Sequence, residues 1–480
     1  MFEIGLSILI VLLFLVFILV MKTLQFRPPT FVDEELEPID LNEAHILASM
    51  KAMVRFKTVS YIDKSKEDPK PFEQFKSYLQ KRYAWIESHG TWLDLGPRSL
   101  LIHIKGASSS APLVLMSHYD VVPQNGTWEH DPFLGDVLDD RLYGRGTLDN
   151  KATLCSIMES LKHLIEDGHT FAQDVYVAFA GDEEIRGGGA DTIVDELSRR
   201  GIVPGLVLDE GGAIVENSFP GIKQPMAVIG TAEKGFMSVQ LIAHDQGGHA
   251  STPKAKTAVT VLAKAVTLLN QKKLFPIQRN VVMDQMFDTL GRHAQSFMLR
   301  MVFANLWLTF PLIRTLAKKQ GGQFAAMLKT TQAFTMMEGS EAINVLPSKA
   351  TVGINYRISL REDADKIEQK LRRALKHLPL EIDVEYATDP TPASLTDATY
   401  EKLTRTIRKV WDNAIPSPYL MMAATDARYH HRISDHVYRF SPMALTQQEF
   451  AMIHGENESI HVDNLFKMVR FYSELIRDFT

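Results

Sequence analysis

The sequence has little cysteine and little net charge, and each shortage excludes a class of protein. Cys155 is the only cysteine among 480 residues, so an internal disulfide and a zinc cluster held by thiolates are both excluded. The formal net charge is -6, and the chain has no block of basic residues, which argues against nucleic acid as a partner. The apolar and charged fractions are those of an ordinary globular protein, and the length predicts two domains or more.

The first residues are rich in long apolar side chains. Ile4 to Met21 contains no charged residue, and as a helix it would span roughly 27 Å, close to the hydrocarbon thickness of a bilayer. A signal peptide would have a basic start and a cleavage site between small residues, and neither is visible. Residues 1–24 are therefore predicted to be a single-pass membrane anchor. Lys22 and Arg27 follow the apolar run that ends at Met21, a weak asymmetry that favours a cytoplasmic C-terminal side but leaves the orientation open.

Short apolar runs alternate with helical periodicity in the first half of the chain. Pro112–Met116, Val175–Ala180 and Gly205–Leu208 have the continuous apolar character of strands that are buried on both faces. Lys151–Asp167 and Ala190–Arg200, which alternate with these runs, have the length and composition of helices. This alternation predicts an α/β fold with a mostly parallel sheet flanked by helices.

After Gly235 the pattern changes to strands that have one exposed face. Met237–His244, Ala350–Ile358 and Glu381–Tyr386 have this character, and helical segments separate them, which predicts an inserted α+β domain. The chain then returns to the α/β domain. The predicted organisation is an anchor over 1–24, an acidic tether over 25–41, the two parts of the α/β domain over 42–234 and 389–480, and the inserted domain over 235–388.

One segment of the inserted domain is unusually apolar. Ser296–Ala317 is rich in Phe, Leu, Met and Trp, but Arg300, Pro311 and Arg314 interrupt it. These interruptions disfavour a second membrane span. The segment is predicted to be either a buried helix or an apolar surface of the inserted domain.

Acidic and imidazole side chains follow the predicted strands of the α/β domain. A single carboxylate at such a position is often the N-cap of a helix, but several at the same edge of a sheet repel one another, and a bound cation is the usual compensation. Histidine and carboxylate ligands without cysteine suit zinc, with cobalt or manganese as substitutes, and a shared carboxylate would allow two metals. The residues are His118 with Asp120, Asp149, Glu183 with Glu184, Asp209 with Glu210, and His454 with Glu456 and Glu458.

The adjacent pair Glu183-Glu184 suggests a division of roles. At the exit of a strand, both side chains can reach one cavity from different angles. One can then bind metal while the other moves the proton of the attacking water. The pair alone would be read as a solvated acidic turn.

Seven motifs together resemble a known family. In chain order they are SHYDVVP, YGRGTLDNK, GDEE, LDEGG, AEKG, GGHAS and HGENE. Their order and spacing are similar to those of the dinuclear zinc carboxypeptidase and aminoacylase family, and most similar to its carboxypeptidase S branch, which includes N-fatty-acyl amino acid hydrolases. The resemblance covers about residues 45–480. It implies a zinc-exopeptidase-like catalytic domain with an inserted lid or dimerisation domain.

The resemblance also implies a role for individual residues of the catalytic domain. His118 and Asp209 would bind one zinc ion, and Glu184 and His454 the other. Asp149 would bridge the two ions. Glu183 corresponds to the general base, and Asp120 to the carboxylate that orients His118.

Four further residues are implied by the same resemblance. His249 corresponds to a histidine that reaches the active site of the partner subunit, which implies a homodimer. Asn344, Arg357 and Thr425 correspond to substrate-binding positions, with Arg357 holding a carboxylate. Two of these have simpler readings, because Arg357 could be a surface arginine of a strand and Asn344 could form the turn before Pro347.

The implied reaction is hydrolysis of an amide bond by water that two zinc ions activate, with glutamate as the general base. Peptides with a free C-terminus and N-acyl amino acids offer the same amide and carboxylate, so both are candidate substrates. Reversible synthesis of N-fatty-acyl amino acids is an alternative, as is a single-metal peptidase. A membrane-tethered binding protein without activity is disfavoured because the base and all the ligands are present.

Overall fold

The computed structural model describes residues 2–29, 39–216, 219 and 221–480, and an eight-stranded sheet lies at its centre. In spatial order the strands are β1 (Gly90–Gly96), β2 (Ser99–Ile104), β6 (Gln173–Ala180), β3 (Ser108–His118), β7 (Leu206–Val215), β16 (Val437–Leu445), β8 (Met226–Glu233) and β15 (Ile415–Met421). The pairs β6–β3, β3–β7 and β7–β16 are parallel, whereas β1, β2 and β8 have antiparallel neighbours. The sheet is therefore mixed, with a parallel centre.

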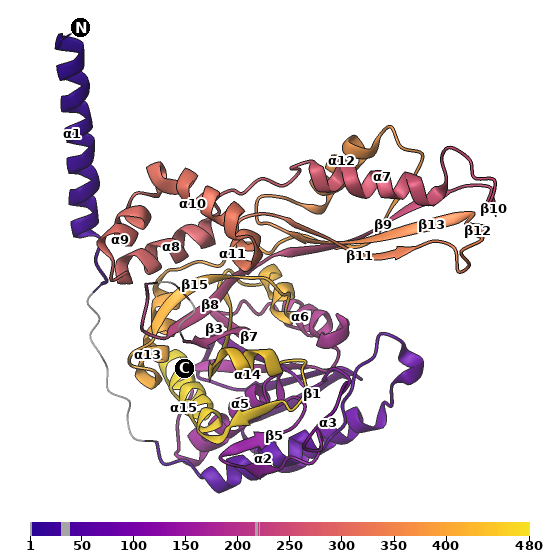
Figure 1. Cartoon of the computed structure of the whole chain (residues 1–480). Helices are drawn as coiled ribbons and strands as arrows, with labels where there is room; N and C mark the ends of the chain where they lie inside the picture. Colours follow the sequence, from indigo (N-terminus) through magenta and orange to yellow (C-terminus); the bar gives the residue numbers. More distant parts are fainter. Residues whose placement is uncertain (1, 30–38, 217–218, 220) are drawn as a thin grey trace.

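Helices cover both faces of this sheet because its central strands are apolar on both sides. In β3, Leu113 and Leu115 pack into one core, and Val114 and Met116 pack into another on the opposite face. The first core contains helices α2 (Glu43–Val54), α5 (Lys151–Glu166), α13 (Ala398–Val410) and α15 (Val462–Phe479), and the second contains α6 (Gly189–Arg199). We call this part of the molecule the large lobe (Figure 1).

The predicted α/β core is confirmed. The three predicted strands lie in β3, β6 and β7, and the two predicted helices correspond to α5 and α6. The antiparallel pair β1–β2 was not predicted, and it extends the sheet beyond β6. The remaining elements of the large lobe are α3 (Lys70–Arg82), α4 (Ile86–His89), α14 (Gln447–Met452) and a small sheet of β4 (Val137–Leu138), β5 (Arg141–Tyr143) and β17 (Ser459–His461).

A second, antiparallel sheet forms a small lobe beside the large one (Figure 1). Its strands are β11 (Thr331–Glu338), β13 (Lys349–Ile358), β9 (Gly235–His244) and β14 (Glu381–Thr388), with helices α7 (Ala258–Gln271) and α12 (Ala364–Leu375) packed on one face. The short strands β10 (Gly248–His249) and β12 (Val345–Leu346) pair at its far end. All these elements lie within 235–388, the range predicted for the inserted domain, although the domain boundaries themselves stay a prediction.

Four helices within the same range pack on the large sheet instead. They are α8 (Val281–His293), α9 (Phe297–Ala304), α10 (Leu306–Gln320) and α11 (Gly322–Met327). Met283 and Phe287 of α8 share an apolar core with Met226 of β8 and with Ile415 and Leu420 of β15. These helices therefore belong, by packing, to the edge of the large lobe.

The apolar segment Ser296–Ala317 forms two helices rather than one. α9 and α10 meet at Asn305 with a bend of 111°. Several large apolar side chains of both helices are exposed, including Trp307 and Leu312 at 57% and 50%. Of the two alternatives that the sequence left open, the apolar surface describes this segment better than the buried helix does.

The helix α1 (Phe2–Gln25) extends away from both lobes (Figure 1). It is long and apolar enough to cross a membrane, and none of its most apolar stretch is buried inside the protein. Residues 30–38, most of the predicted tether, lie outside the described residues.

Candidate metal centre

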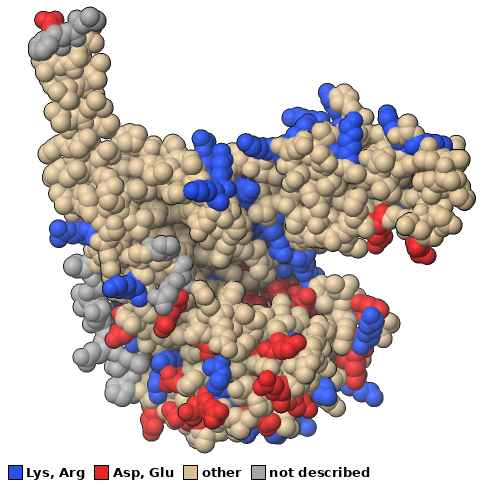
Figure 2. Space-filling model, in the orientation of Figure 1, with Lys and Arg blue, Asp and Glu red and all other residues tan. Residues whose placement is uncertain are grey.

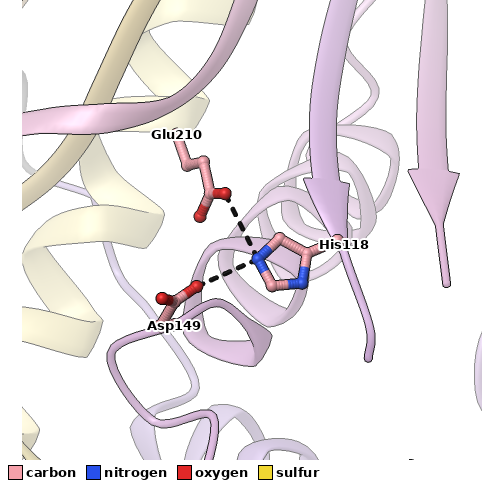
Figure 3. A group of neighbouring side chains, drawn as sticks. All are labelled: His118, Asp149 and Glu210. Atoms are coloured by element: carbon pink, nitrogen blue, oxygen red, sulfur yellow. Dashed lines mark hydrogen bonds and ion pairs between the residues drawn. The ribbon is translucent and has the colours of Figure 1, made fainter. Parts of the chain in front are cut away.

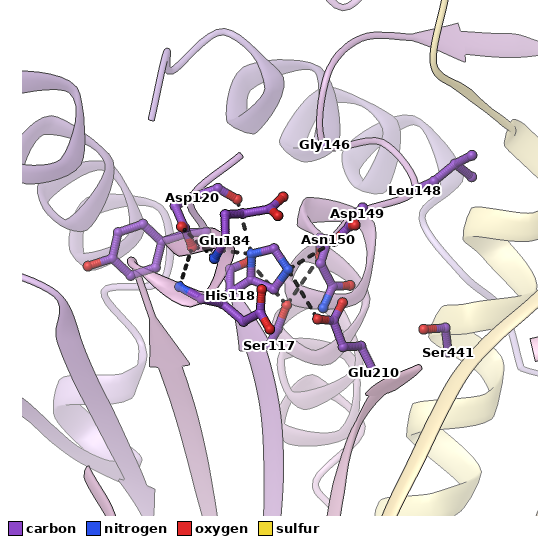
Figure 4. A network of polar contacts seen from close by, with 12 residues as sticks. Ser117, His118, Asp120, Gly146, Leu148, Asp149, Asn150, Glu184, Glu210 and Ser441 are labelled. Atoms are coloured by element: carbon purple, nitrogen blue, oxygen red, sulfur yellow. Dashed lines mark hydrogen bonds and ion pairs between the residues drawn. The ribbon is translucent and has the colours of Figure 1, made fainter. Parts of the chain in front are cut away.

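Acidic and imidazole side chains from separate segments meet at one edge of the large sheet. His118 ends β3, Glu183 and Glu184 lie in the short turn after β6, and Glu210 lies in β7. Asp149 comes two residues before α5. The segments with His118, the two glutamates and Glu210 follow, or are part of, parallel strands whose carboxyl ends share one edge, which is where open α/β sheets bind their ligands. Figure 4 shows several of these groups around the ring of His118.

The first group of ligand atoms centres on His118. Its Nε2 atom lies 2.9 Å from Oδ1 of Asp149 and 3.2 Å from Oε1 of Glu210 (Figure 3). The imidazole is 2% exposed, so these three side chains form a largely enclosed pocket of donors. Such a set of one nitrogen and two carboxylates could hold a metal ion.

The second group uses the other oxygen of Asp149. Oδ2 of Asp149 lies 3.0 Å from Nε2 of His454, and that nitrogen lies 3.2 Å from Oε2 of Glu184. His454 comes from the loop after α14, where its backbone takes a left-handed conformation with φ of 60°. Because one oxygen of Asp149 faces each group, the arrangement fits two cations that share this carboxylate.

Burial makes the charged carboxylates of this cluster unfavourable. Burial raises the pKa of Glu210 to about 8 and that of Glu184 to about 7, and Asp149 contributes to both increases. Burial also acts against the charged form of His118, but the surrounding carboxylates raise its pKa well above the usual value. The two histidines lower the pKa of Asp149, so it is Glu184 and Glu210 whose charged forms are unfavourable, and a bound cation would stabilise these forms.

Asp120 connects His118 to the pair of glutamates. Its Oδ1 atom lies 3.3 Å from Nδ1 of His118, and its backbone carbonyl lies 3.0 Å from the same nitrogen. Its two carboxylate oxygens accept the backbone N–H groups of Glu183 and Glu184, at 3.2 and 3.1 Å. This fully buried side chain thus positions one ligand by its ring and two further groups by their backbone.

Glu458 holds the loop that carries Asp149. One of its oxygens pairs with Arg145 at 2.8 Å, and the other accepts N–H groups of Gly146, Leu148 and Asp149. Gly146 has φ of 90°, and a Cβ atom there would lie 2.8 Å from Val121. The sequence analysis assigned no role to Glu458, although the second glutamate of the HGENE motif was a visible signal.

The structure places Glu210, and not Asp209, beside His118. Oδ2 of Asp209 accepts the backbone N–H of Ala427 at 2.8 Å, and within the described ranges its carboxylate belongs to neither group of ligand atoms. Adjacent residues of a strand point to opposite faces, so the LDEGG motif alone could not select the correct one. We therefore propose Glu210, in place of the predicted Asp209, as the carboxylate that would bind a metal ion with His118.

Paired substitutions distinguish these two carboxylates. We expect Glu210→Gln to lose about one of two bound metal ions, because an amide is a much weaker ligand than a carboxylate. Asp209→Asn is the matched control and is expected to keep both ions. Elemental analysis of the purified proteins measures the metal content per chain, and the opposite pattern of loss would restore Asp209 as the ligand.

Glu183 lies next to the ligands but outside both groups that the described residues form. Burial raises its pKa well above the usual value, and Asp426, Glu210 and Glu184 add to the increase. A carboxyl group whose pKa is raised by burial beside a candidate metal centre is a candidate for proton transfer.

Two arginines, Arg186 and Arg357, lie near the ring of Phe236. The guanidinium of Arg186 lies 3.8 Å from the ring centroid of Phe236, and that of Arg357 lies 5.1 Å from the same ring. Burial lowers the pKa of both arginines; Arg428 lowers that of Arg186 further, and Arg186 that of Arg357. A substrate-binding role for Arg357 stays a prediction. Arg186 was not singled out from the sequence, although it follows the acidic GDEE-Ile segment directly. Figure 2 shows red and blue atoms facing each other in the hollow between the lobes.

The other predicted substrate residues lie elsewhere. His249 and Asn344 are exposed at the far end of the small lobe, where the backbone N–H of Ala250 donates to the carbonyl of Asn344 (Figure 1). Thr425 is buried, and its hydroxyl donates to Glu233 at 2.8 Å. The substrate-binding role of Asn344 and Thr425 and the catalytic role of His249 stay predictions.

The two-lobed α/β fold and the acidic centre at the carboxyl edge of its sheet define a metal-dependent hydrolase. Comparison with known families agrees, since the model for "Peptidase family M20/M25/M40" matches residues 114–478. The chain belongs to this family and is an enzyme of the metallopeptidase and amidohydrolase type.

Individual relatives and a solved structure agree with this assignment. The chain is 32% identical to the "N-fatty-acyl-amino acid synthase/hydrolase PM20D1" of Xenopus tropicalis, over 90% of this chain and 85% of the relative. It is 30% identical to the "Probable carboxypeptidase S-like 2" of Dictyostelium discoideum, over 96% and 91%. A crystal structure of the M20 metallo-carboxypeptidase Sso-CP2 of Sulfolobus solfataricus superposes with a TM-score of 0.65 at 16% identity, over 90% of this chain and 99% of that one.

Proposed function

We propose that this enzyme uses two zinc ions to hydrolyse the amide bond of N-acyl amino acids or of peptides with a free C-terminus. The observation that carries the proposal is that Asp149 offers one oxygen to each of two groups of ligand atoms. His118 and Glu210 complete one zinc site, and Glu184 and His454 complete the other. Nitrogen and carboxylate donors without sulfur suit zinc, and cobalt or manganese could substitute.

The proposed chemistry divides the work between the metal ions and the side chains. When bound, the two ions supply the Lewis acidity that lowers the pKa of a water molecule and polarises the amide carbonyl. Glu183 accepts the proton of the attacking water and returns it to the leaving amine. Asp120 fixes the position of Glu183 relative to His118, because it binds the backbone N–H of Glu183 and the ring of His118.

The substrate carboxylate is proposed to bind at the basic wall formed by Arg357 and Arg186. Guanidinium groups bind carboxylates through paired hydrogen bonds. Arg186 is close enough to Glu183 for their charges to interact, and Arg357 shares the ring of Phe236 with Arg186. The named activity of the Xenopus relative favours a fatty acyl group on the other side of the amide. The same active site would then also catalyse synthesis from a fatty acid and an amino acid when both are abundant.

A substrate panel tests this function. We expect long-chain N-acyl amino acids to be cleaved with a higher kcat/KM than dipeptides, and the corresponding N-acyl amino acid amides to be poor substrates because they lack the carboxylate. Hydrolysis is followed by release of the free amino acid, with metal content measured on the same preparations. Equal rates for acids and amides would contradict the role of the basic wall, and a preference for dipeptides would reassign the substrate.

Arginine variants locate the carboxylate site within that panel. Arg357→Met and Arg186→Met keep most of the side-chain volume but remove the guanidinium. Each is expected to raise KM for the carboxylate substrates and to leave the slow cleavage of the amides unchanged. Arg199→Met, at the exposed C-terminal end of α6 where the guanidinium pairs with Glu196, is the matched control.

His249 is proposed to act in the active site of a partner subunit. It lies at the far end of the small lobe, away from the ligand groups of its own chain, so a homodimer would be needed to bring it to a metal centre (Figure 1). There its imidazole would stabilise the oxyanion that forms during attack on the carbonyl. In this arrangement the small lobe serves as both lid and dimerisation domain.

Mixed dimers test the role of His249. Chains with Glu183→Gln and chains with His249→Ala are each expected to be nearly inactive alone. Coexpression should restore activity to about a quarter of wild type, because half of randomly formed dimers contain one intact composite site. Coexpression of Glu183→Gln with Asp149→Ala is the control, since both changes lie in the large lobe and no intact site can form. Absence of recovery in the first mixture would place His249 outside catalysis.

The helix α1 is proposed to be a single-pass membrane anchor. Its composition and its exposure suit a bilayer, and the described part of the chain buries none of its most apolar stretch. The predicted tether would then connect the anchor to the catalytic domain. Flotation of the full-length protein with lipid vesicles, resistant to high salt and to alkaline carbonate, is the result expected of a spanning helix.

A further inference from the structure

The helices α9 and α10 present an apolar surface next to the base of α1. Its residues are Phe297, Met298, Trp307, Leu308, Leu312 and Leu316, which are between 42% and 63% exposed. We call this surface the apolar shoulder. In α10, Leu308, Leu312 and Leu316 follow one another at intervals of four residues and therefore share one face of the helix.

The opposite face of α10 is also apolar. Leu306, Ile313 and Ala317 are buried in the core that α8 forms with β8 and β15. A helix whose buried face already satisfies the protein core has no need of a second apolar face in water. The second face indicates an apolar environment outside the described part of the chain.

The bend between α9 and α10, together with α8, contacts the C-terminal end of α1. The side-chain amide of Asn305, at the bend between α9 and α10, donates to the hydroxyl of Thr23 and to the carbonyl of Leu19, each at 3.4 Å. The guanidinium of Arg292 lies 4.6 Å from the ring centroid of Phe26 and donates to the carbonyl of Arg27 at 3.1 Å. Any bilayer that contains α1 therefore reaches the protein at the shoulder (Figure 1).

The charge distribution agrees with a membrane on this side. Figure 2 shows Lys and Arg gathered on the upper face of the small lobe, over α7 and α12, on the side toward which α1 extends, and the acidic side chains in that view lie mainly below. Arg314, Lys318 and Lys319 of α10 are exposed beside the shoulder. Basic residues next to an apolar helix face are typical of helices that lie in the membrane interface.

We propose that the apolar shoulder is a second membrane contact, with α9 and α10 lying in the interface of the same bilayer that α1 spans. The proposal rests on the membrane anchor proposed above. The 111° bend at Asn305 and the charged residues Arg300 and Arg314 suit two short helices that lie in the interface rather than one that crosses it. A second contact would hold the large lobe in one orientation to the membrane, which a single helix followed by a tether would not.

Lipid-dependent quenching of a fluorescent label tests the proposal in the full-length chain. The only native cysteine, Cys155, is buried, so an introduced cysteine can be labelled selectively. The variants are Leu312→Cys on the shoulder, Leu12→Cys in α1, and Val203→Cys as a control in the loop between α6 and β7, where the side chain is 64% exposed. Each is labelled with a polarity-sensitive dye and reconstituted into vesicles of phosphatidylcholine and phosphatidylserine with nitroxide-labelled lipids.

The three positions give distinct outcomes. We expect a blue shift and strong quenching at Leu12→Cys and Leu312→Cys, and neither at Val203→Cys. Water-like emission at Leu312→Cys while Leu12→Cys is quenched would overturn the second contact but keep the anchor. Water-like emission at both would overturn both. A disulfide between two copies through Leu312→Cys would show that the shoulder binds another chain instead.

Amide hydrolysis measured in detergent distinguishes a failure of the second membrane contact from a failure of the proposed enzymatic function. The labelled variants are assayed in detergent, where hydrolysis requires the metal centre but no bilayer. We expect all three to retain wild-type kcat, because none of the positions lies near the ligand groups. Absence of the blue shift and of quenching at Leu312→Cys alone, with full activity, would count against the apolar shoulder alone. Full quenching at both positions, without any amide hydrolysis by the wild type, would count against the proposed hydrolysis alone.

Discussion

Glu183→Gln is expected to lower kcat by about four orders of magnitude, the upper end of what a proton-transferring side chain contributes. Gln has nearly the same shape and keeps the backbone N–H that donates to Asp120, so the fold and the ligands should remain in place. It cannot accept the proton of the attacking water. The measurement is the steady-state rate with an N-acyl amino acid, together with metal content.

Two controls accompany this substitution. Glu87→Gln makes the same chemical change on the exposed surface of α4 and should have wild-type activity. Glu183→Asp keeps a carboxylate but shortens the side chain, so a partial rate is expected. If Glu183→Gln lost bound metal as well as activity, Glu183 would have to be counted among the ligands rather than as the base.

Asp149→Ala should have the broadest effect of any ligand substitution, because this carboxylate faces both groups. We expect the variant to retain less than about one metal ion per chain and to have no detectable hydrolysis. Substitution of Glu210 or His454, which each face one group, should leave the other ion bound.

Thermal unfolding provides a second measurement of this effect. Ions that bind only the folded state raise its Tm, so a chelator should lower the Tm of the wild type. The Tm of Asp149→Ala should not respond to the chelator, whereas Asp288→Asn, an exposed change on α8, should respond as the wild type does. A chelator response that persists in Asp149→Ala would mean that this residue does not bridge the ions.

Much of the α/β core could be predicted because local patterns specify it. The apolar runs of β3, β6 and β7 require burial on both faces, and α5 and α6 have helical composition between them. The antiparallel pair β1–β2 was not predicted. It is a local hairpin, but its place in the large sheet depends on the pairing of β2 with β6, which lies far along the chain. The same is true of α8 to α11, which lie inside the predicted inserted domain but pack on the large sheet.

The candidate site, like the fold, could be predicted from the sequence only in part. The residue types and the order of the motifs, read together with the family that they resemble, were sufficient to predict that His118, Asp149, Glu184 and His454 would lie close together. They could not decide between Asp209 and Glu210, because neighbours in a strand point in opposite directions and the twist of β7 determines which one faces His118. Nor could they show that Glu458, far along the chain, holds the Asp149 loop by accepting its N–H groups.

The sequence by itself thus determined the class of fold, the apolar N-terminal helix and the acidic and imidazole inventory of a metal-dependent hydrolase, because hydrophobic periodicity and ligand chemistry are properties of residues in order. Only the tertiary structure decided which carboxylate completes each group, that Arg186 joins Arg357 above the site, and that the apolar shoulder adjoins α1. Those are contacts between residues far apart in the chain, and their geometry exists only once the sheet and its covering helices are packed.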